Sequence, residues 1–386
     1  MAPLAGKHIF DIVVRRAAHS DWPAVREFIS QTYGPVASYK GVDRWRWQFA
    51  DNPYRPVGEE GFSVWIAIAS DGRVAGQIAV QDAAVWLGGR HFPAGWIVDV
   101  MVHPDFRGQG LSHRIHAHVM KERALLVTLT MAPATRRIAE RAGAITLGPT
   151  RQFIRPVRLS VGTIRRFLSY KTRHRARFAN LVGLFNATWI GPALVSTGAQ
   201  SAAALAAAFR SRPRRTLFDV EEITHFPDLL DAFWGDSRDA FQVIFERSTK
   251  FLNWRFCDSP GLSYRRFLLR RDRTIRGYLV TRLADEAELP AGIIVDFFAR
   301  PNDGEALDAL LALAHDVLAP DCEYIEAAAS TPAYRSALVR ASFLGTRTMW
   351  PTVVCTNPAL QARIAANIQN WHFTKADHDW DQVHPV

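Results

Sequence analysis

The chain has 386 residues, of which 48% are hydrophobic and 22% charged, and its formal net charge is +10. This length favours more than one domain, and this composition excludes a disordered, collagen-like or disulfide-rich secreted chain. The cysteines are three in number, widely spaced and without a metal-ligand spacing, and residues 1–10 contain no apolar run typical of a signal peptide. We therefore expect a reduced, cytoplasmic protein without a bound metal.

The positive charge is concentrated in one segment. Between Arg141 and Phe218 there are 14 Lys or Arg residues and no Asp or Glu. No nucleic-acid reader motif accompanies this charge, so nucleic-acid binding is disfavoured. Residues 178–209 carry no charge, but their Asn, Gly, Pro and Gln residues argue against a membrane span. Two interpretations of residues 157–216 stay open: a helical linker between domains, and a helical segment lying on an anionic membrane surface.

Hydrophobic periodicity and turn residues predict alternating strands and helices before this segment. A β-branched run begins at Ile12, and a Ser-Asp-Trp-Pro start precedes a helix that ends at Tyr33. Strands expected at 62–69 and 73–80 flank the turn Ser70-Asp71-Gly72 of a predicted hairpin. A second hairpin is expected to turn at Gly88-Gly89, after a strand at 85–87. The later expected elements are a buried strand at 94–102, a helix at 110–123, a strand at 125–131 and a short helix at 135–142.

Five short features recur in the second half of the chain in the same order. The segment WQFADNP at 47–53 is echoed by WRFCDSP at 254–260, and PAGWIVD at 93–99 by PAGIIVD at 290–296. The other matches are His19 with His225, Gly76 with Gly277, and Arg141 with Arg340, so that all offsets lie between 197 and 207 residues. This regularity predicts two copies of one α/β domain with a mixed sheet, at 8–156 and 217–356, followed by a C-terminal tail at 357–386.

One motif carries chemistry in the first copy. Residues 104–112, PDFRGQGLS, follow a predicted strand and open a predicted helix. Glycines at such a turn let backbone N–H groups converge on an anion, and the helix adds the positive end of its dipole. Arg107 supplies a charge-assisted contact. The segment lacks the Gly-Lys-Ser/Thr ending of a phosphate-binding P-loop and the dinucleotide fingerprint.

The motif resembles the acyl-CoA motif of the GNAT N-acetyltransferase superfamily, Arg/Gln-x-x-Gly-x-Gly/Ala after a strand ending Val-x-Pro. Arg107 and Gly110 match this pattern, and Ser112 replaces its last small residue. The order of elements in the first copy is also similar to that of the family. The resemblance implies transfer of an acyl group from acetyl-CoA, or another acyl-CoA, to an amine or a hydroxyl.

The resemblance also implies roles for individual residues. The expected CoA-binding residues are Val100, Met101, Val102, Arg107, Gly108, Gln109, Gly110, Leu111 and Ser112. Asp99 is the only carboxylate on the motif strand, so it is the candidate catalytic base or water-positioning group, unless it serves structure as Asp296 would in the second copy. His103 is the second candidate. The tyrosine that the family often uses to protonate the CoA thiolate is replaced by Ala139.

Three other features are not expected to form a cofactor, sugar or cation site. The second copy has acidic residues, Asp303 and Glu305, where the first has its glycine-rich turn, so we expect it to bind no CoA and to shape the structure or the acceptor site. The aromatic residues Trp45, Trp47, Phe49 and Tyr54 are expected to pack in the core rather than to stack on sugars. The last residues, with Asp377, His378, Asp379, Asp381 and His384, are expected to form a solvated tail rather than a cation site.

We therefore expect a cytoplasmic acyltransferase built from two GNAT-like domains, with acyl-CoA bound by the first. Its acceptor is a small molecule or a glycan, and the basic segment favours a sugar intermediate of polysaccharide or envelope synthesis at the inner membrane face. Two alternatives stay open. One is an aminoacyl or peptidyl transferase of the tandem-GNAT type, and the other is a non-catalytic protein that binds CoA or another ligand for regulation. The oligomeric state is not indicated.

Overall fold

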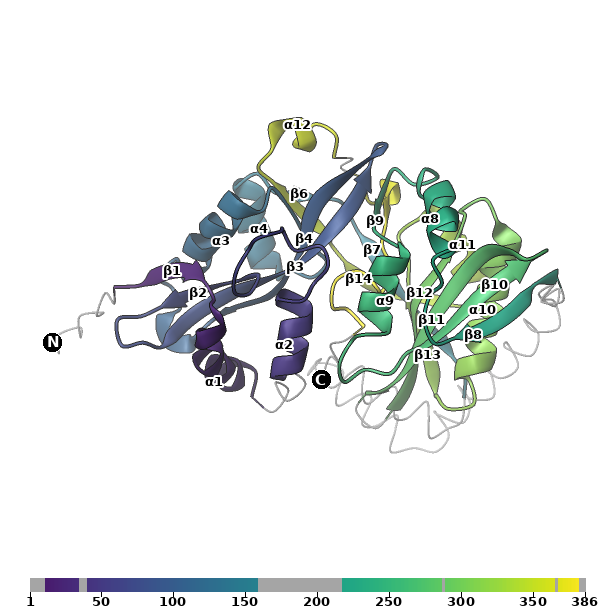
Figure 1. Ribbon diagram of the computed structural model, residues 1–386, viewed down its shortest axis with the longest axis horizontal. Coiled ribbons are helices and arrows are strands. Elements are labelled where there is room, and N and C mark those ends of the chain that lie inside the picture. The colour runs from purple at the N-terminus through teal and green to yellow at the C-terminus, as the bar shows by residue number, and fades with distance from the viewer. Residues whose placement is uncertain (1–10, 35–39, 159–216, 287–288, 365–366, 382–386) are drawn as a thin grey trace, which may run out of the picture. The chain divides into compact units, whose positions relative to one another are not determined.

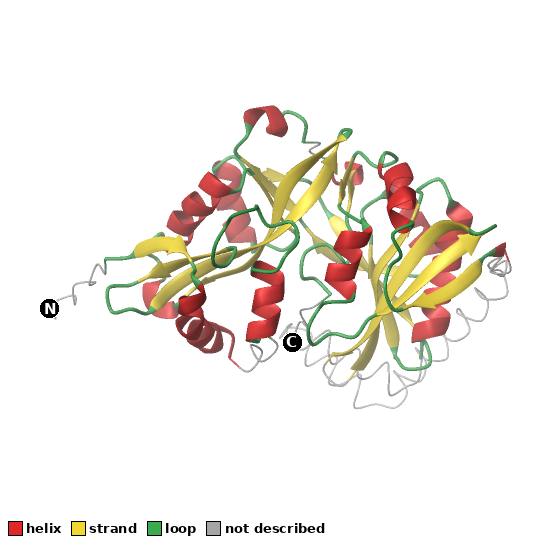
Figure 2. Ribbon diagram, viewed as in Figure 1, coloured by secondary structure: helices red, strands yellow, loops and turns green. Residues whose placement is uncertain are grey.

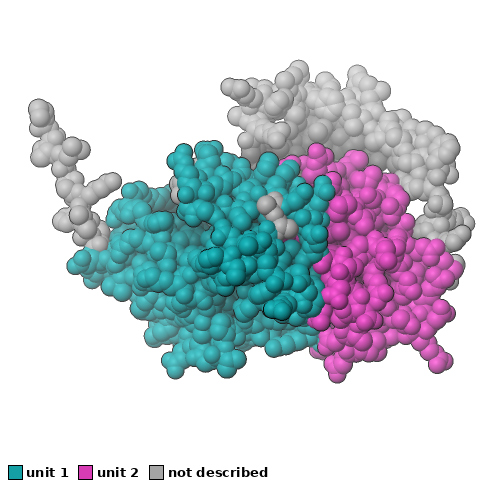
Figure 3. All heavy atoms as spheres, turned by 90° about the horizontal axis from the view of Figure 1, so that it is seen from above, with its two compact units in different colours: residues 1–149, 242–262, 350–370 teal, residues 150–241, 263–349, 371–386 magenta. Residues whose placement is uncertain are grey.

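Helices and strands alternate along the chain in the order expected for a mixed α/β protein (Figures 1 and 2). This computed structural model describes residues 11–34, 40–158, 217–286, 289–364 and 367–381. The basic segment at 159–216 lies outside the described residues. The chain divides into two compact units, each made of three stretches of sequence (Figure 3). Unit 1 comprises residues 1–149, 242–262 and 350–370, and unit 2 comprises residues 150–241, 263–349 and 371–386.

Unit 1 is built on a mixed sheet with the strand order β1-β2-β3-β4-β5-β15-β6, and β9 pairs with the far end of β3. Its strands are β1 (Val13–Arg16), β2 (Val64–Ile68), β3 (Val74–Leu87), β4 (Arg90–Val102), β5 (Leu125–Thr128), β6 (Ile145–Thr146), β9 (Val243–Phe245) and β15 (Thr352–Cys355). Its α-helices are α1 (Trp22–Tyr33), α2 (Val42–Phe49), α3 (Leu111–Glu122), α4 (Pro133–Arg141), α9 (Thr249–Phe256) and α12 (Pro358–Gln361). Single 3-10 turns lie at η1 (His19–Asp21), η3 (Pro104–Phe106) and η5 (Ile368–Asn370).

Glycines with positive φ form the hairpin turns of this sheet. In the predicted hairpin, Ala69 N–H donates to the carbonyl of Arg73, and Gly72 has φ +84°. Between β3 and β4, Gly88 and Gly89 both have positive φ, which a tight two-residue hairpin requires. Both hairpins predicted from the sequence are therefore confirmed, although β3 and β4 extend further than expected.

Helix α3 packs its apolar side on one face of the sheet. Its buried residues Leu111, Ile115 and Val119 belong to one core cluster with residues of β2, β3, β4 and β5. Gly76 lies beneath this helix, since a Cβ added there would come within 3.5 Å of Leu111 and Ile115 side-chain atoms. Burying the α3 stripe against the sheet fixes the start of the helix directly after the end of β4.

Unit 2 has the same architecture. Its sheet has the order β8-β10-β11-β12-β13-β7-β14. Its strands are β7 (Thr150–Pro156), β8 (Asp219–Ile223), β10 (Arg265–Arg271), β11 (Thr274–Glu286), β12 (Leu289–Ala299), β13 (Tyr324–Ala328), β14 (Leu344–Met349) and β16 (Trp371–His372). Its α-helices are α8 (Leu230–Arg238), α10 (Gly304–Leu318) and α11 (Pro332–Arg340). The repeated order of elements confirms the α/β class and agrees with an internal duplication.

The two sheets differ from the sequence repeat in one respect: each holds the last strand of the other copy. Strand β7 follows the first copy in sequence but pairs with β13 and β14 in unit 2. Strand β15 ends the second copy but pairs with β5 and β6 in unit 1. Strand β15 lies between β5 and β6, and β7 lies between β13 and β14, so the two strands occupy equivalent positions in their sheets. The compact units therefore do not coincide with the sequence ranges 8–156 and 217–356.

The expectation of a solvated tail is wrong for residues 371–381, most of which are buried in unit 2. Lys375 Nζ lies 2.8 Å from Glu326 Oε2 on β13. Thr374 Oγ1 donates to Asp296 on β12 at 2.9 Å. Aspartates in the tail sequence suggest solvent exposure. The partners of Lys375 and Thr374 lie more than 40 residues away in the sequence, and no local pattern reveals them.

Candidate functional site

The glycine-rich motif of the first copy forms the connection between β4 and α3. The 3-10 turn η3 follows β4 and ends at Phe106, which is buried. Gly108 and Gly110 have φ of +78° and +69°, a left-handed conformation that glycine adopts without strain. The helix then begins at Leu111, one residue later than predicted.

This connection has the properties of an anion site. No side chain caps the first turn of α3, whose N–H groups have no partners within the helix. A Cβ added at Gly108 or Gly110 would meet nothing within 4 Å, so the backbone is open to a ligand. Arg107 is exposed beside the glycines, and its Nε donates to the carbonyl of Val102 at 3.3 Å. A diphosphate fits these groups, because it needs converging N–H donors and one cation.

Strands β4 and β5 separate towards this connection. Their parallel pairing covers only Gly95 with Leu126 and Trp96 with Val127. Beyond these pairs, β4 continues to Val102. Along this stretch, the edge of β4 that faces away from β3 has no β5 residue paired with it. Val100 is 43% exposed on this stretch. The end of β4 therefore offers backbone groups to an extended ligand that leads away from the diphosphate site.

Asp99 lies in a β-bulge of β4. The register of β4 on β3 shifts between Gln77 and Ala79, so two β4 residues oppose one β3 residue. Asp99 has φ +50°, which is uncommon for a residue with a side chain and typical of functional sites when it occurs. The bulge also redirects the side chain of Asp99 towards the end of α1 and the segment before α2.

Two residues that the sequence did not single out hold Asp99. Lys40 Nζ lies 2.5 Å and 2.6 Å from the two carboxylate oxygens, and Tyr33 Oη donates to Oδ1 at 3.1 Å. The side chains of Lys40 and Asp99 are 6% and 5% exposed. Asp99 is therefore an ion-paired, nearly buried carboxylate. No sequence motif links Lys40 to it, because the two residues lie 59 positions apart in the chain.

His103 has a local partner. Its Nδ1 accepts a hydrogen bond from the backbone N–H of Asp105 at 3.3 Å, which caps the turn η3. Its ring also contacts Phe28 and Phe106, with centroid distances of 6.5 Å and 5.9 Å. This residue thus shapes the start of the glycine-rich connection. Its predicted catalytic role stays a prediction, as does that of Asp99.

The corresponding connection of unit 2 is closed. Asp303 caps α10 by accepting from Ala306 N–H at 3.1 Å, and Arg276 forms an ion pair with the same carboxylate. At the end of β12, the hydroxyl of Tyr334 hydrogen-bonds to both the N–H and the carbonyl of Ala299. The helix N-terminus that has no side-chain cap in unit 1 is therefore capped by a side chain in unit 2.

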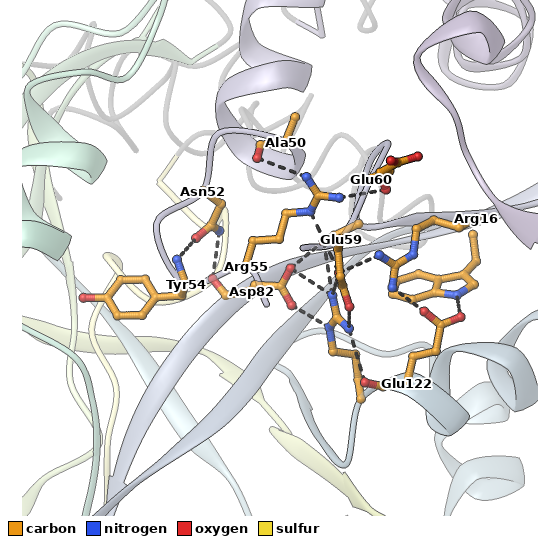
Figure 4. Close-up of polar contacts among 12 residues, drawn as sticks. Arg16, Ala50, Asn52, Tyr54, Arg55, Glu59, Glu60, Asp82 and Glu122 are labelled. Carbon is orange, nitrogen blue, oxygen red and sulfur yellow. Dashed lines mark hydrogen bonds and ion pairs between the residues drawn. The ribbon is translucent and has the colours of Figure 1, made fainter. Parts of the chain in front are cut away.

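A partly buried charge network supports the loop between α2 and β2 (Figure 4). Arg123 bridges Asp82, at 2.6 Å, and Glu59, at 2.7 Å, while Arg16 pairs with Glu59 and Glu122. Burial would raise the pKa of Glu59, but the hydrogen bonds from Arg123 and Arg16 outweigh it and lower the pKa to about 2. Burial raises the pKa of Asp82, which the Arg123 guanidinium offsets only in part. The network fixes the loop without taking part in the predicted chemistry.

The comparisons with known proteins concern the family and the fold. A family model described as an acetyltransferase (GNAT) domain matches residues 13–144. Residues 13–144 therefore carry a GNAT domain. The matched range includes the bulged strand β4, the glycine-rich connection and α3. No curated protein matches the chain.

Solved structures share the fold of the whole chain at low sequence identity. A GCN5-related N-acetyltransferase from Anabaena variabilis is 12% identical, with 90% of this chain and 73% of that chain covered and a TM-score of 0.59. A GCN5-related N-acetyltransferase from Kribbella flavida is 14% identical, with 91% and 72% covered and a TM-score of 0.54. The Saccharomyces cerevisiae N-myristoyltransferase with bound myristoyl-CoA is 10% identical, with 91% and 83% covered and a TM-score of 0.53. These similarities extend the GNAT-like fold beyond the GNAT domain itself.

Within the described ranges, no helix has the length and apolar character needed to cross a membrane. The same ranges contain no group of three His, Cys, Asp or Glu side chains that is placed to hold a metal ion. The predicted membrane contact of residues 158–216 falls almost entirely on residues that are not described.

Proposed function

We propose that the protein is an acyl-CoA-dependent acyltransferase whose acyl-CoA site lies in the GNAT domain. The observation that carries the proposal is the open, glycine-lined start of α3 at the end of the bulged strand β4. Its counterpart in unit 2 is capped by Asp303 and closed by Tyr334, which supports a single acyl-CoA site per chain.

The residues of this site have separate tasks in the proposal. The N–H groups around Gly108 and Gly110, together with Arg107, hold the diphosphate. Backbone groups of Val100, Met101 and Val102 hold the extended part of the ligand, and an N–H group of β4 stabilises the charge that develops on the thioester oxygen. Acyl-CoA supplies an activated acyl group. Asp99, held by Lys40 and Tyr33, takes the proton that the amine or hydroxyl acceptor loses, directly or through a water molecule.

The acceptor in this proposal is a small molecule or a glycan, such as a sugar intermediate of polysaccharide or envelope synthesis. The basic segment motivates this choice, since clustered Lys and Arg residues bind anionic lipid. Sedimentation of the full chain with vesicles of phosphatidylcholine and phosphatidylglycerol tests it at low and high salt. Binding that depends on the anionic lipid and is weakened by salt is expected, and no binding at low salt contradicts the membrane location.

Isothermal titration calorimetry with acetyl-CoA tests the acyl-CoA site itself. We expect the wild-type chain to bind and the Arg107→Glu variant to bind at least about tenfold more weakly, because one charge-assisted contact becomes repulsive. The matched control is Arg26→Glu, which makes the same charge change at an exposed position of α1. If Arg107→Glu binds as tightly as the wild type and the control, the site is not where we place it.

A further inference from the structure

Gln77 on β3 is a buried amide without a partner. Its residue exposure is 0%, and neither its side-chain nitrogen nor its oxygen has a hydrogen-bond partner. Of the residues that the structure describes, it is the one amide for which both polar atoms are buried and unsatisfied. Leaving a donor and an acceptor together without partners costs free energy, so such a group in a folded core calls for an explanation.

The register of the sheet places Gln77 beside the bulge that carries Asp99. Gln77 lies opposite Met101 on β4, two residues after Asp99, and directly opposed residues share one face of a sheet. This face is the one that α2 covers, because Gln81, four residues along β3, accepts a hydrogen bond from Gln48 of α2. Asp99 points to the same side, since it contacts Tyr33 at the end of α1 and Lys40 shortly before α2. Gln77 and the Asp99 carboxylate therefore flank one site.

The second copy has a different residue at the matching position. Gly76 pairs with Val102, three residues after Asp99, and Gly277 pairs with Ala299, three residues after Asp296. Tyr278 is thus the counterpart of Gln77. Its hydroxyl donates to Asp296 at 2.8 Å, and Thr374 from the C-terminal segment donates to the other carboxylate oxygen.

The two copies differ in whether the side chain at this position has hydrogen-bond partners. In unit 2 the counterpart residue, Tyr278, is satisfied within the chain by its hydrogen bond to Asp296. In unit 1 the same position holds an amide with a free N–H donor and a free carbonyl acceptor, next to a carboxylate that is already ion-paired with Lys40. A ligand that completes this site must both donate and accept hydrogen bonds.

We propose that Gln77 is an acceptor-binding residue, whose amide holds the hydroxyl or primary amine of the acyl acceptor beside Asp99. This inference rests on the proposed acyltransferase function and names a residue that sets the acceptor class. A group with one acceptor and at least one donor satisfies both halves of the amide. An acceptor that offers only a thioether, a carboxylate or an apolar group does not.

The test compares Gln77→Met with Gln81→Met, which removes an amide of the same size from the same face of the same strand. Without ligand, we expect Gln77→Met to melt at or above the wild-type temperature, because it removes an unsatisfied buried group. Gln81→Met is expected to melt lower, because it leaves Gln48 without its partner. A loss of stability in Gln77→Met as large as in Gln81→Met overturns the proposal, since the amide would then be satisfied within the protein.

Activity is measured on the same samples as acceptor-dependent thiol release from acetyl-CoA, with a panel of primary amines, amino sugars and sugars. We expect Gln77→Met to lower kcat/KM for the best acceptor by roughly tenfold to a hundredfold, mainly through KM, while acetyl-CoA binding stays unchanged. Equal kcat/KM for Gln77→Met and the wild type contradicts the inference. So does the absence of acceptor-dependent thiol release by the wild type. Calorimetry with acetyl-CoA separates the two failures. If the wild type does not bind acetyl-CoA, the proposed function is wrong. If the wild type binds acetyl-CoA, only the inference about Gln77 is wrong.

Discussion

Trp47 and Trp254, which occupy the same position in the two sequence copies, stack on each other within unit 1. Their ring centroids lie 4.8 Å apart with an interplanar angle of 20°. Each indole N–H also donates to the backbone carbonyl of the other residue, at 2.9 Å and 3.3 Å. The pair is therefore reciprocal in both its stacking and its hydrogen bonds. Such symmetry is expected where two copies of one domain share a core.

This reciprocity predicts coupling between the two residues. Trp47→Phe and Trp254→Phe each remove one hydrogen bond and part of the stacking, so each is expected to lower the free energy of unfolding by about 1–2 kcal/mol. The double variant should lose less than the sum, with a coupling of about 0.5–1.5 kcal/mol. Urea unfolding of the four proteins measures this cycle, and strictly additive losses would show that the two side chains do not interact.

Asp99 and Asp296, which occupy matching positions in the two copies, predict different effects on activity. Asp99→Asn removes the proposed base, so it should lower the rate of acyl transfer by roughly 10²–10⁴-fold while acetyl-CoA binding persists. Asp296→Asn, the matched change in unit 2, should leave the rate per folded molecule unchanged. Its carboxylate accepts hydrogen bonds from Tyr278 and Thr374, both in unit 2. Thiol release from acetyl-CoA and calorimetry are the measurements, and equal rates for Asp99→Asn and the wild type would remove Asp99 from the mechanism.

The charge network around Glu59 predicts a pH dependence of stability. The pKa of Glu59 is lowered to about 2 from its ordinary value of 4.5. Its contribution is therefore fully present above pH 4.5 and is lost as the pH falls from 4.5 towards 2. Because solvent screens this partly exposed group, we expect a contribution of about 1–2 kcal/mol.

Unfolding by urea between pH 2.5 and 7 measures this contribution. Glu59→Gln should be less stable than the wild type at pH 7, and the difference should shrink as the pH falls below 4.5. Its neighbour Glu60 is exposed, so Glu60→Gln is the matched control and should change stability little at any pH. A Glu59→Gln difference that is constant with pH would place the effect in packing rather than in charge.

The elements that follow from local sequence were predictable. The two glycine turns, the strand before Pro104 and the helix after Gly110 depend on residues within a few positions of each other. The glycine-rich motif could be interpreted for the same reason, because its backbone conformation and its anion site arise from one short segment.

The partners of Asp99 and the exchange of strands were not predictable. Lys40 meets Asp99 across 59 residues of sequence, and neither β7 nor β15 carries a pattern that selects one sheet over the other. Both strands are short and could pair in either unit. Their choice depends on packing of the whole chain, which hydrophobic periodicity does not encode. Gln77 was missed because a glutamine in a strand signals nothing until its burial and its lack of partners are known.

The C-terminal segment supplies the last prediction, because its burial reverses what its composition suggests. Lys375 and Glu326 form an ion pair whose side chains are 3% and 8% exposed. Lys375→Met removes the ammonium from a buried carboxylate on β13, and breaking such a pair typically costs about 3–5 kcal/mol. The double variant Lys375→Met with Glu326→Gln removes both charges and should recover part of that loss.

The matched control for this pair is exposed. Arg340 and Asp308 are 51% and 41% exposed, so Arg340→Met should change the free energy of unfolding by less than about 1 kcal/mol. Urea unfolding and proteolysis of the full chain compare the four proteins. If Lys375→Met were no more destabilising than Arg340→Met, the segment would not be docked on β13 in solution. A large loss for Lys375→Met, with partial recovery in the double variant, is the result that a buried segment requires, because only a desolvated charge depends so strongly on its partner.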